Sequence, residues 1–382
     1  MSTKSLIFGD KVLLVIVLLL SLFSFFPVFS SSSYLSYVID GASPIYYLVK
    51  HLIVILFGFI LMLSIKLVPF KFFRGMSVIL LPIGIGLLVY TLSQGTIIGG
   101  SAASRWIDIP FVGISFQTSA LAAIIIITYT ARYLSKVELS KTKFSETLIP
   151  LWLPIFLYIF LIFPANFSSA FLIFTSLVIT LFISGFPLRH LFKVFLILGF
   201  LLITFFFTAK TFPDKFPNRI DTWLSRIENF GSNKNLDASY QIERAKMAIN
   251  NGGLIGVGAG KSIMKNHLPQ SNSDFIFAII VEEWGSIGGA FIICLYILMF
   301  FRFLSITHRI DDRFGKILVS GLGVFIIIQA FTNISVATQI IPVTGQNLPL
   351  ISSGGSSAWM TCISLGMILS VSSSIKNKNG KQ

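Results

Sequence analysis

Long runs of apolar residues, separated by short polar segments, extend along almost the whole chain. A helix needs about 20 mostly apolar residues to cross the hydrocarbon core of a bilayer. The runs predict ten membrane-spanning helices, and the short fifth and sixth are interpreted as a tight helical hairpin around residues 164–168. We place the ten at residues 12–31, 46–68, 76–93, 117–134, 148–163, 169–186, 191–208, 275–302, 316–337 and 352–372. The predicted fold class is therefore an all-α polytopic membrane protein.

Basic residues are unevenly divided between the two sets of loops that these ten spans define. With a cytoplasmic N-terminus, one cytoplasmic loop alone contains Lys136, Lys141 and Lys143. The short loops on the other side contain Arg105, with Lys50 at the start of one helix. Short cytoplasmic loops of membrane proteins are enriched in Lys and Arg. The asymmetry predicts ten spans with both termini in the cytoplasm.

The composition excludes a water-soluble domain. Of the 382 residues, 54% are hydrophobic and only 12% are charged, against about 25% charged in a typical soluble domain. A net charge of +14 would suggest nucleic acid in a soluble protein, but basic loops here are expected to contact anionic membrane lipid instead. Cys294 and Cys362 lie inside apolar runs, which argues against a disulfide framework or a metal cluster.

One polar segment, residues 209–274, is much longer than the other loops and lies between the seventh and eighth spans, on the external side. Loops of this length are usually functional or disordered. Apolar residues alternate with charged ones at 223–230 and 240–249, which predicts short amphipathic helices on the membrane surface. Residues 252–261 are rich in glycine, so the backbone there could approach a ligand closely or simply form a flexible loop.

Asp274 is the last polar residue before the eighth apolar run. It could cap the helix that follows, or act as a partly desolvated carboxylate and a better base than one in water, and the two roles are compatible. Glu282 and Glu283 lie two turns further along. Acidic residues inside a span usually face a cavity or a partner, so we expect them to pair with a buried Lys or Arg or to bond a neighbouring helix.

The segment 341–357, between the last two spans, has no charge, two prolines and three glycines. Residues 352–357 would begin the final helix, where free N–H groups and the helix dipole favour an anion. A lipid pyrophosphate in the outer leaflet is the natural anion at this position. A capped turn buried in protein is the alternative.

Three separated stretches together resemble proteins of the SEDS family (shape, elongation, division and sporulation). They are residues 100–107 with Phe116-Gln117, residues 252–285, and residues 342–357, the last reading Pro-Val-Thr-Gly-Gln-Asn-Leu-Pro-Leu-Ile-Ser-Ser-Gly-Gly-Ser-Ser. The resemblance covers essentially the whole chain, as one membrane domain of residues 1–382. The Gly260–Lys265 stretch is more similar to division-type than to elongation-type members.

The resemblance implies a glycosyltransferase that polymerises lipid II, the undecaprenyl-pyrophosphate-linked disaccharide-pentapeptide, on the outer face of the bacterial cytoplasmic (inner) membrane, with the division septum as the expected location. Asp274 matches the family's catalytic Asp. The expected pyrophosphate-binding residues are Arg105, Lys265, Ser352, Gly354, Gly355, Ser356 and Ser357. A divalent cation could assist, although no ligand cluster is visible. A class B penicillin-binding protein and other divisome membrane proteins are the implied partners, and no nucleic acid is expected.

The chain departs from the family pattern at several positions. A Glu and a Lys three residues apart are replaced by Ala120 and Ala123, and losing both removes such a pair without leaving a buried charge unpaired. The family's Pro-Asp is Pro164-Ala165, and its Leu-Pro-Glu is Leu268-Pro269-Gln270. These departures keep open a non-catalytic divisome scaffold. A lipid II flippase without chemistry is the other alternative, in which polar residues inside the spans would line a path across the bilayer.

Overall fold

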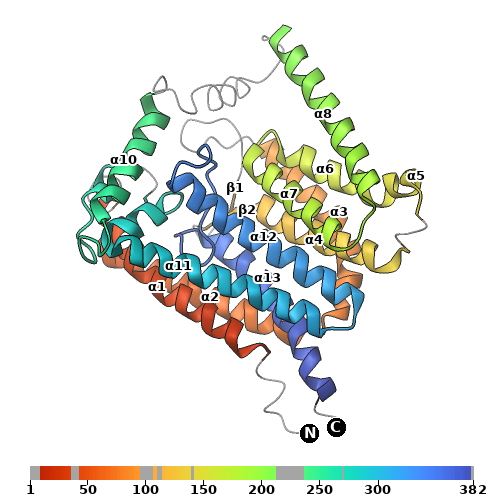
Figure 1. The fold of residues 1–382 in the computed structure, drawn as a ribbon, viewed down its shortest axis with the longest axis horizontal. Helices are drawn as coiled ribbons and strands as arrows, with labels where there is room; N and C mark the ends of the chain where they lie inside the picture. The colour runs from red at the N-terminus through yellow and green to blue at the C-terminus, as the bar shows by residue number, and fades with distance from the viewer. Residues whose placement is uncertain are drawn as a thin grey trace.

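The computed structural model describes residues 9–35, 43–94, 106–109, 114–138, 142–211, 236–268 and 271–379, which form a bundle of long helices (Figure 1). The helices are α1 (Lys11–Leu35), α2 (Pro44–Leu67), α3 (Lys71–Gln94), α4 (Thr118–Lys136), α5 (Phe144–Thr147), η3 (Leu148–Trp152), α6 (Leu153–Ile162), α7 (Phe167–Ile183), α8 (Leu188–Thr211), α10 (Leu236–Gly252), η5 (Met264–Asn266), α11 (Ile276–Arg309), α12 (Arg313–Ala337) and α13 (Gly355–Asn379). Two short strands, β1 (Trp106–Ile109) and β2 (Ile114–Gln117), complete the described structure.

The described helices confirm the predicted architecture. Eight segments are long and apolar enough to cross a membrane, with α5, η3 and α6 together forming one of them. The 17-residue apolar helix α7 and the 24-residue helix α8 bring the number to ten. The helical hairpin between α6 and α7 is also confirmed, since Asn166 caps α7 by accepting a hydrogen bond from the N–H of Ser169 at 3.1 Å.

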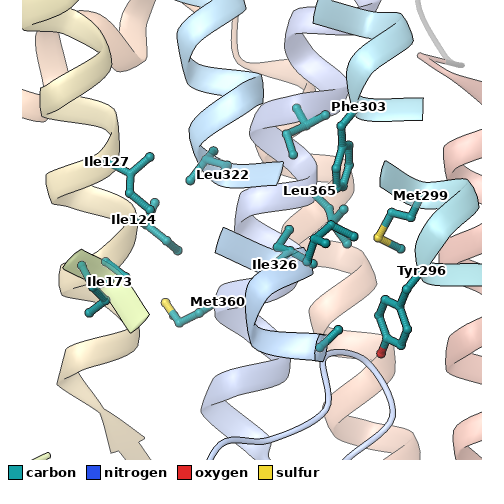
Figure 2. Close-up of a cluster of buried hydrophobic side chains, with 14 of the residues drawn as sticks. Ile124, Ile127, Ile173, Tyr296, Met299, Phe303, Leu322, Ile326, Met360 and Leu365 are labelled. Atoms are coloured by element: carbon teal, nitrogen blue, oxygen red, sulfur yellow. The ribbon is translucent and has the colours of Figure 1, made fainter. Parts of the chain in front are cut away.

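The core of the bundle lies around α12 and α13. In each, 72% of the most apolar stretch is buried, compared with 22% in α3, so α3 lies at the periphery. Figure 2 shows apolar side chains of α4, α7 and α11 meeting those of the two central helices. The labelled members of this cluster are Ile124, Ile127, Ile173, Tyr296, Met299, Phe303, Leu322, Ile326, Met360 and Leu365.

Helix α8 differs from the others because it diverges from the bundle (Figure 1). Phe192, Phe200, Ile203 and Phe207 are each more than 60% exposed. Such a surface is stable only in contact with lipid or another apolar partner. Most of the apolar surface of α8 therefore faces the surroundings and does not pack against the rest of this chain.

The two ends of the bundle have different structures. At one end, here called the termini end, the N–H of Asp10 donates to Ser372 Oγ at 2.8 Å, and Arg302 forms an ion pair with Asp10. The start of α1 and the last turns of α13 therefore meet, as an even number of crossings predicts. The opposite end, here called the hairpin end, contains the β1–β2 hairpin and α10 (Figure 1).

The hairpin end contains the features that the all-α prediction did not include. Strands β1 and β2 pair antiparallel, with Trp106 opposite Gln117, and the N–H of Gln117 donates to Ser356 Oγ of α13 at 3.1 Å. The amphipathic helix predicted at 240–249 is confirmed as α10, which buries Ala245 and Ala248. The helix predicted at 223–230 lies outside the described residues.

Candidate functional site

Helix α11 is broken inside the bundle. Gly285 has φ 69° and ψ −175°, a conformation that side-chain-bearing residues avoid. Residues 276–283 before the break are all buried, and together with Trp284 they form a short half-helix that leads to the spanning part of α11. The span predicted at 275–302 is confirmed as α11, but its break at Gly285 was not anticipated from the sequence.

The glycine-rich segment supplies hydrogen-bond partners for the backbone groups at this break. A broken helix leaves carbonyl groups on one side and N–H groups on the other without partners, and lipid cannot satisfy them. Here the N–H groups of residues 257 and 258 donate to the carbonyls of Glu282 and Glu283, both at 3.0 Å. In return, the N–H groups of residues 286 and 287 donate to the carbonyls of residues 253 and 254, at 2.9 and 3.3 Å.

Close backbone contact explains two of the glycines. A Cβ on Gly256 would lie 2.3 Å from the carbonyl oxygen of Glu283, and a Cβ on Gly285 would lie 2.1 Å from that of Leu254. Both distances are far below van der Waals contact. The sequence suggested a flexible loop or a close approach to a ligand, but the backbone that these glycines approach is α11 itself.

Glu282 and Glu283 at the break are 0% and 2% exposed. Glu282 accepts hydrogen bonds from the hydroxyl of Ser262 and from the N–H groups of residues 263 and 264, at 3.3 Å each. Glu283 accepts from the hydroxyl of Ser30 in α1 and from the N–H of Ser262 at 3.4 Å. Of the two roles expected for these carboxylates, the structure shows bonding to a neighbouring helix, together with the loop.

Lys265 lies in η5, on the side of the loop that faces α1. Its ammonium donates to the carbonyl of Gly260 at 2.7 Å and to Ser30 Oγ at 3.2 Å, and the residue is half-buried. The hydroxyl of Ser271 donates to the Lys265 carbonyl at 3.4 Å. Lys265 is thereby connected to the short segment that contains Asp274.

Asp274 is only 8% exposed and directly precedes the half-helix. The residue at the N-cap position of α11 is Phe275, so Asp274 lies one position before the cap that the sequence suggested. Its segment is enclosed by the loop of residues 262–268 on one side and by the 346–354 turn on the other.

Three successive carbonyls, those of residues 272–274, are held from outside the segment. The N–H of Ser353 donates to the first at 2.9 Å, the hydroxyl of Ser352 to the second at 2.7 Å, and the side-chain amide of Asn333 to the third at 2.9 Å. The backbone of Asp274 is therefore fixed by residues from both α12 and the turn before α13.

Asn333 contacts the candidate site, although no role was predicted for it from the sequence. It is 0% exposed, and its amide also donates to the carbonyl of Gln346 at 2.7 Å. Gln346 in turn donates to Ser169 Oγ of α7 at 2.9 Å. An uncharged polar side chain deep in an apolar span is the signal that could have identified Asn333, since such residues need a partner inside the membrane.

The serine-rich turn begins the final helix, as predicted, with Gly355 as the first residue of α13. Gly354 packs beneath the side chain of Asn347, since a Cβ there would lie 2.3 Å from Asn347 Nδ2. Ser356 is fully buried and accepts the bond from β2. The first N–H groups of α13 have no acceptor within the helix, so the anion site expected at this turn stays a prediction.

A small polar cavity lies directly below this turn, among α4, α7, α12 and α13. Its volume is about 20 Å³, enough for about one water molecule. Ala120 contributes to its wall, at the position where the family has a Glu. The uncharged polar residues that line it are Gln117, Ser119, Ser169, Gln329, Gln346, Ser357, Thr361 and Ser364.

The structure thus brings Asp274 and the 352–357 turn together, with Lys265 on the far side of the Asp274 segment. Arg105 lies outside the described residues, as do Pro269 and Gln270. In the described ranges, no three His, Cys, Asp or Glu side chains come together as a metal site would require.

Among the described residues, ten apolar helices packed as a bundle define a polytopic membrane protein, with a buried aspartate between a glycine-rich loop and a serine-rich turn. The chain belongs to the FtsW/RodA/SpoVE family of cell cycle proteins, whose family model matches residues 10–377.

Relatives in this family resemble the chain over most of their length. The probable peptidoglycan glycosyltransferase FtsW of Hydrogenovibrio crunogenus is 31% identical over 333 residues, which cover 86% of this chain and 82% of that protein. Stage V sporulation protein E of Bacillus subtilis is 29% identical over 366 residues, covering 95% of this chain and 96% of that protein.

Two solved structures have the same fold. A chain from a structure entitled "Structural coordination of polymerization and crosslinking by a peptidoglycan synthase complex" superposes with a TM-score of 0.73 at 20% identity, covering 96% of this chain and 98% of that one. The rod shape determining protein RodA of Thermus thermophilus superposes with a TM-score of 0.66 at 21% identity, covering 95% and 96%.

Proposed function

We propose that this protein is a peptidoglycan glycosyltransferase that polymerises lipid II during cell division, with Asp274 as its catalytic base. The observation that carries the proposal is the placement of Asp274: it is buried, its backbone is fixed by Ser352 and Asn333, and it lies beside a helix start suited to an anion. The full-length similarity to relatives named peptidoglycan glycosyltransferase FtsW supports the same activity.

The reaction joins two sugars and releases a lipid pyrophosphate. Asp274 takes the proton from the GlcNAc 4-hydroxyl of an incoming lipid II, because a hydroxyl is a poor nucleophile at neutral pH. The oxygen attacks the anomeric carbon of the growing strand, a new glycosidic bond forms, and the bond from that carbon to the pyrophosphate breaks. The electron pair leaves with the undecaprenyl pyrophosphate.

Negative charge develops on the leaving pyrophosphate, and cations and N–H donors aimed at it lower the barrier. We assign this task to Arg105, Lys265 and the turn formed by Ser352, Gly354, Gly355, Ser356 and Ser357. A divalent cation, if bound beside these groups, would supply further positive charge.

The same proposal places the protein in the bacterial inner membrane, at the division septum, with the hairpin end outside and the termini end in the cytoplasm. A class B penicillin-binding protein that crosslinks the new strands is the proposed partner, together with other divisome membrane proteins. The structural similarity to a chain from a complex that couples polymerisation with crosslinking supports this pairing.

A lipid II flippase is the first alternative, in which polar residues inside the spans would line a path across the bilayer. A non-catalytic scaffold is the second, because Ala120 and Ala123 stand where the resemblance implies a charged pair. The motifs with special residues cluster at the hairpin end and most spans are nearly uncharged, which favours chemistry at the surface over transport across the bundle.

Purified protein mixed with lipid II in detergent separates the glycosyltransferase from the two alternatives, since micelles have no second leaflet to receive a flipped lipid. We expect glycan strands, detected by gel electrophoresis, from the protein alone or with its cognate penicillin-binding protein. Absence of strands in both reactions would leave the flippase and the scaffold.

A further inference from the structure

The two buried carboxylates at the α11 break are not equally satisfied. Both oxygens of Glu282 accept hydrogen bonds from the loop. Glu283 accepts hydrogen bonds through Oε1 only. Its Oε2 is buried without a hydrogen-bond partner among the described residues. A buried carboxylate in this state attracts any cation within reach, because its desolvation is incompletely compensated.

Lys265 is that cation, and one hydroxyl separates it from Glu283. The Ser30 hydroxyl has a single hydrogen, which it donates to Glu283, and its oxygen accepts from the Lys265 ammonium at 3.2 Å. Lys265 and Glu283 are thus connected through Ser30 rather than joined in a direct ion pair.

This spacing leaves part of the ammonium available. A lysine has three N–H donors, of which one goes to Ser30 and one to the Gly260 carbonyl. The third can bind an anion. A direct ion pair would instead draw the ammonium toward α1 and away from the Asp274 segment.

We infer that Ser30 is a positioning residue: its hydroxyl holds Lys265 apart from Glu283, so that the ammonium stays available for the pyrophosphate of a lipid-linked substrate. The inference rests on the proposed function, in which Lys265 contacts that pyrophosphate. It assigns a role in substrate binding to the outer end of α1, a helix that contributes no other residue to the proposed site.

Removing the hydroxyl has a definite consequence. In Ser30→Ala, the space between Lys265 and Glu283 opens, and the flexible lysine stem lets the ammonium close it. Attraction between opposite charges strengthens as they approach in a poorly screened interior. Lys265 then forms a direct ion pair with Glu283 and no longer contacts the substrate.

The test measures the dissociation constant of undecaprenyl pyrophosphate for the full-length protein in detergent, together with kcat and KM for lipid II. We expect Ser30→Ala to weaken binding about tenfold, the size of one lost charge-assisted hydrogen bond, and to lower kcat/KM by at least as much, because the same ammonium is assigned to the charge that develops on the leaving pyrophosphate. Ser30→Thr, which keeps the hydroxyl, should bind like the wild type.

The decisive variant is Ser30→Ala combined with Glu283→Gln. Removing the competing charge should free Lys265 and return binding to within about threefold of the wild type, a non-additivity expected of residues in one network. A merely structural defect at Ser30 would instead be made worse by a second buried substitution.

Ser31→Ala is the matched control. Ser31 is equally buried in the same turn of α1, but its hydroxyl bonds only the carbonyl of Val28 within the helix, at 3.3 Å. It should bind like the wild type, and thermal stability in detergent confirms that each variant is folded.

Three results would overturn the inference: Ser30→Ala binding like Ser31→Ala, no rescue by Glu283→Gln, or unchanged binding in Lys265→Met. Failure of the proposed function looks different. In that case the wild type binds undecaprenyl pyrophosphate but makes no glycan strands. The dissociation constants of the variants still test the role of Ser30, because they do not depend on polymerisation.

Discussion

The serine hydroxyls of the 352–357 turn contact different segments of the candidate site, and the Ser352 hydroxyl makes two hydrogen bonds. The Ser352 hydroxyl donates to the Ser273 carbonyl at 2.7 Å, and its oxygen accepts from the N–H of Leu348 at 2.8 Å; the residue is 4% exposed. Ser352→Ala leaves both groups buried without this partner, at a cost of about 1–3 kcal/mol each. We predict a lower melting temperature in detergent and reduced polymerisation, because the Asp274 segment loosens.

Ser353 offers the comparison for this prediction. Its side chain is exposed, and its contact with Asn272 is made by the backbone N–H, which alanine retains. Ser353→Ala should therefore match the wild type in melting temperature and rate. Equal behaviour of the Ser352 and Ser353 variants would contradict the role given to the Ser352 hydroxyl.

At the scale of elements, the break in α11 is the feature on which the site geometry depends. Alanine at Gly285 would have to adopt a positive φ and would place its Cβ 2.1 Å from the Leu254 carbonyl. Backbone strain of this kind costs about 1–3 kcal/mol before the clash is counted. We predict that Gly285→Ala displaces the loop, lowers the melting temperature and reduces polymerisation.

Gly86 in α3 is the control for this substitution. It lies on an exposed face, where a Cβ would meet no atom within 4 Å, and alanine favours a helix over glycine by about 1 kcal/mol. Gly86→Ala should leave the rate unchanged and the protein no less stable. If Gly285→Ala behaved in the same way, the break would not need a glycine.

The sequence predicted the spans well because the length of an apolar run is set by the bilayer, a local constraint. It did not predict the break, because one glycine within an apolar run looks the same in a straight helix. The groups that satisfy the break belong to residues 253–258, some 30 positions away. The β1–β2 hairpin was missed for a similar reason, since four-residue strands carry little pattern of their own.

The candidate site was predictable in part. Asp274 and the 352–357 turn were identified from motif resemblance and from their positions beside apolar runs. Their mutual contacts, and the roles of Asn333 and Ser30, depend on which helices are neighbours. Nothing in the local sequence specifies that arrangement.

For the whole molecule, the proposed orientation makes a labelling prediction. In a variant without Cys294 and Cys362, a cysteine at position 251 in α10 should react with a membrane-impermeant maleimide in intact cells. A cysteine at position 145 in α5 should react only after permeabilisation, because basic loops stay in the cytoplasm. Both positions are exposed. The reverse pattern would invert the topology and remove Asp274 from the outer surface.

The most direct test of the proposed mechanism is the rate of lipid II polymerisation by Asp274→Asn, purified with its partner. Asparagine keeps the size and hydrogen-bonding shape of aspartate but cannot accept the proton, and general-base catalysis is typically worth about 10²–10⁴-fold. We predict a loss of this size in a protein that melts and co-purifies like the wild type. A normal rate in Asp274→Asn would contradict the mechanism and leave Asp274 a structural role only.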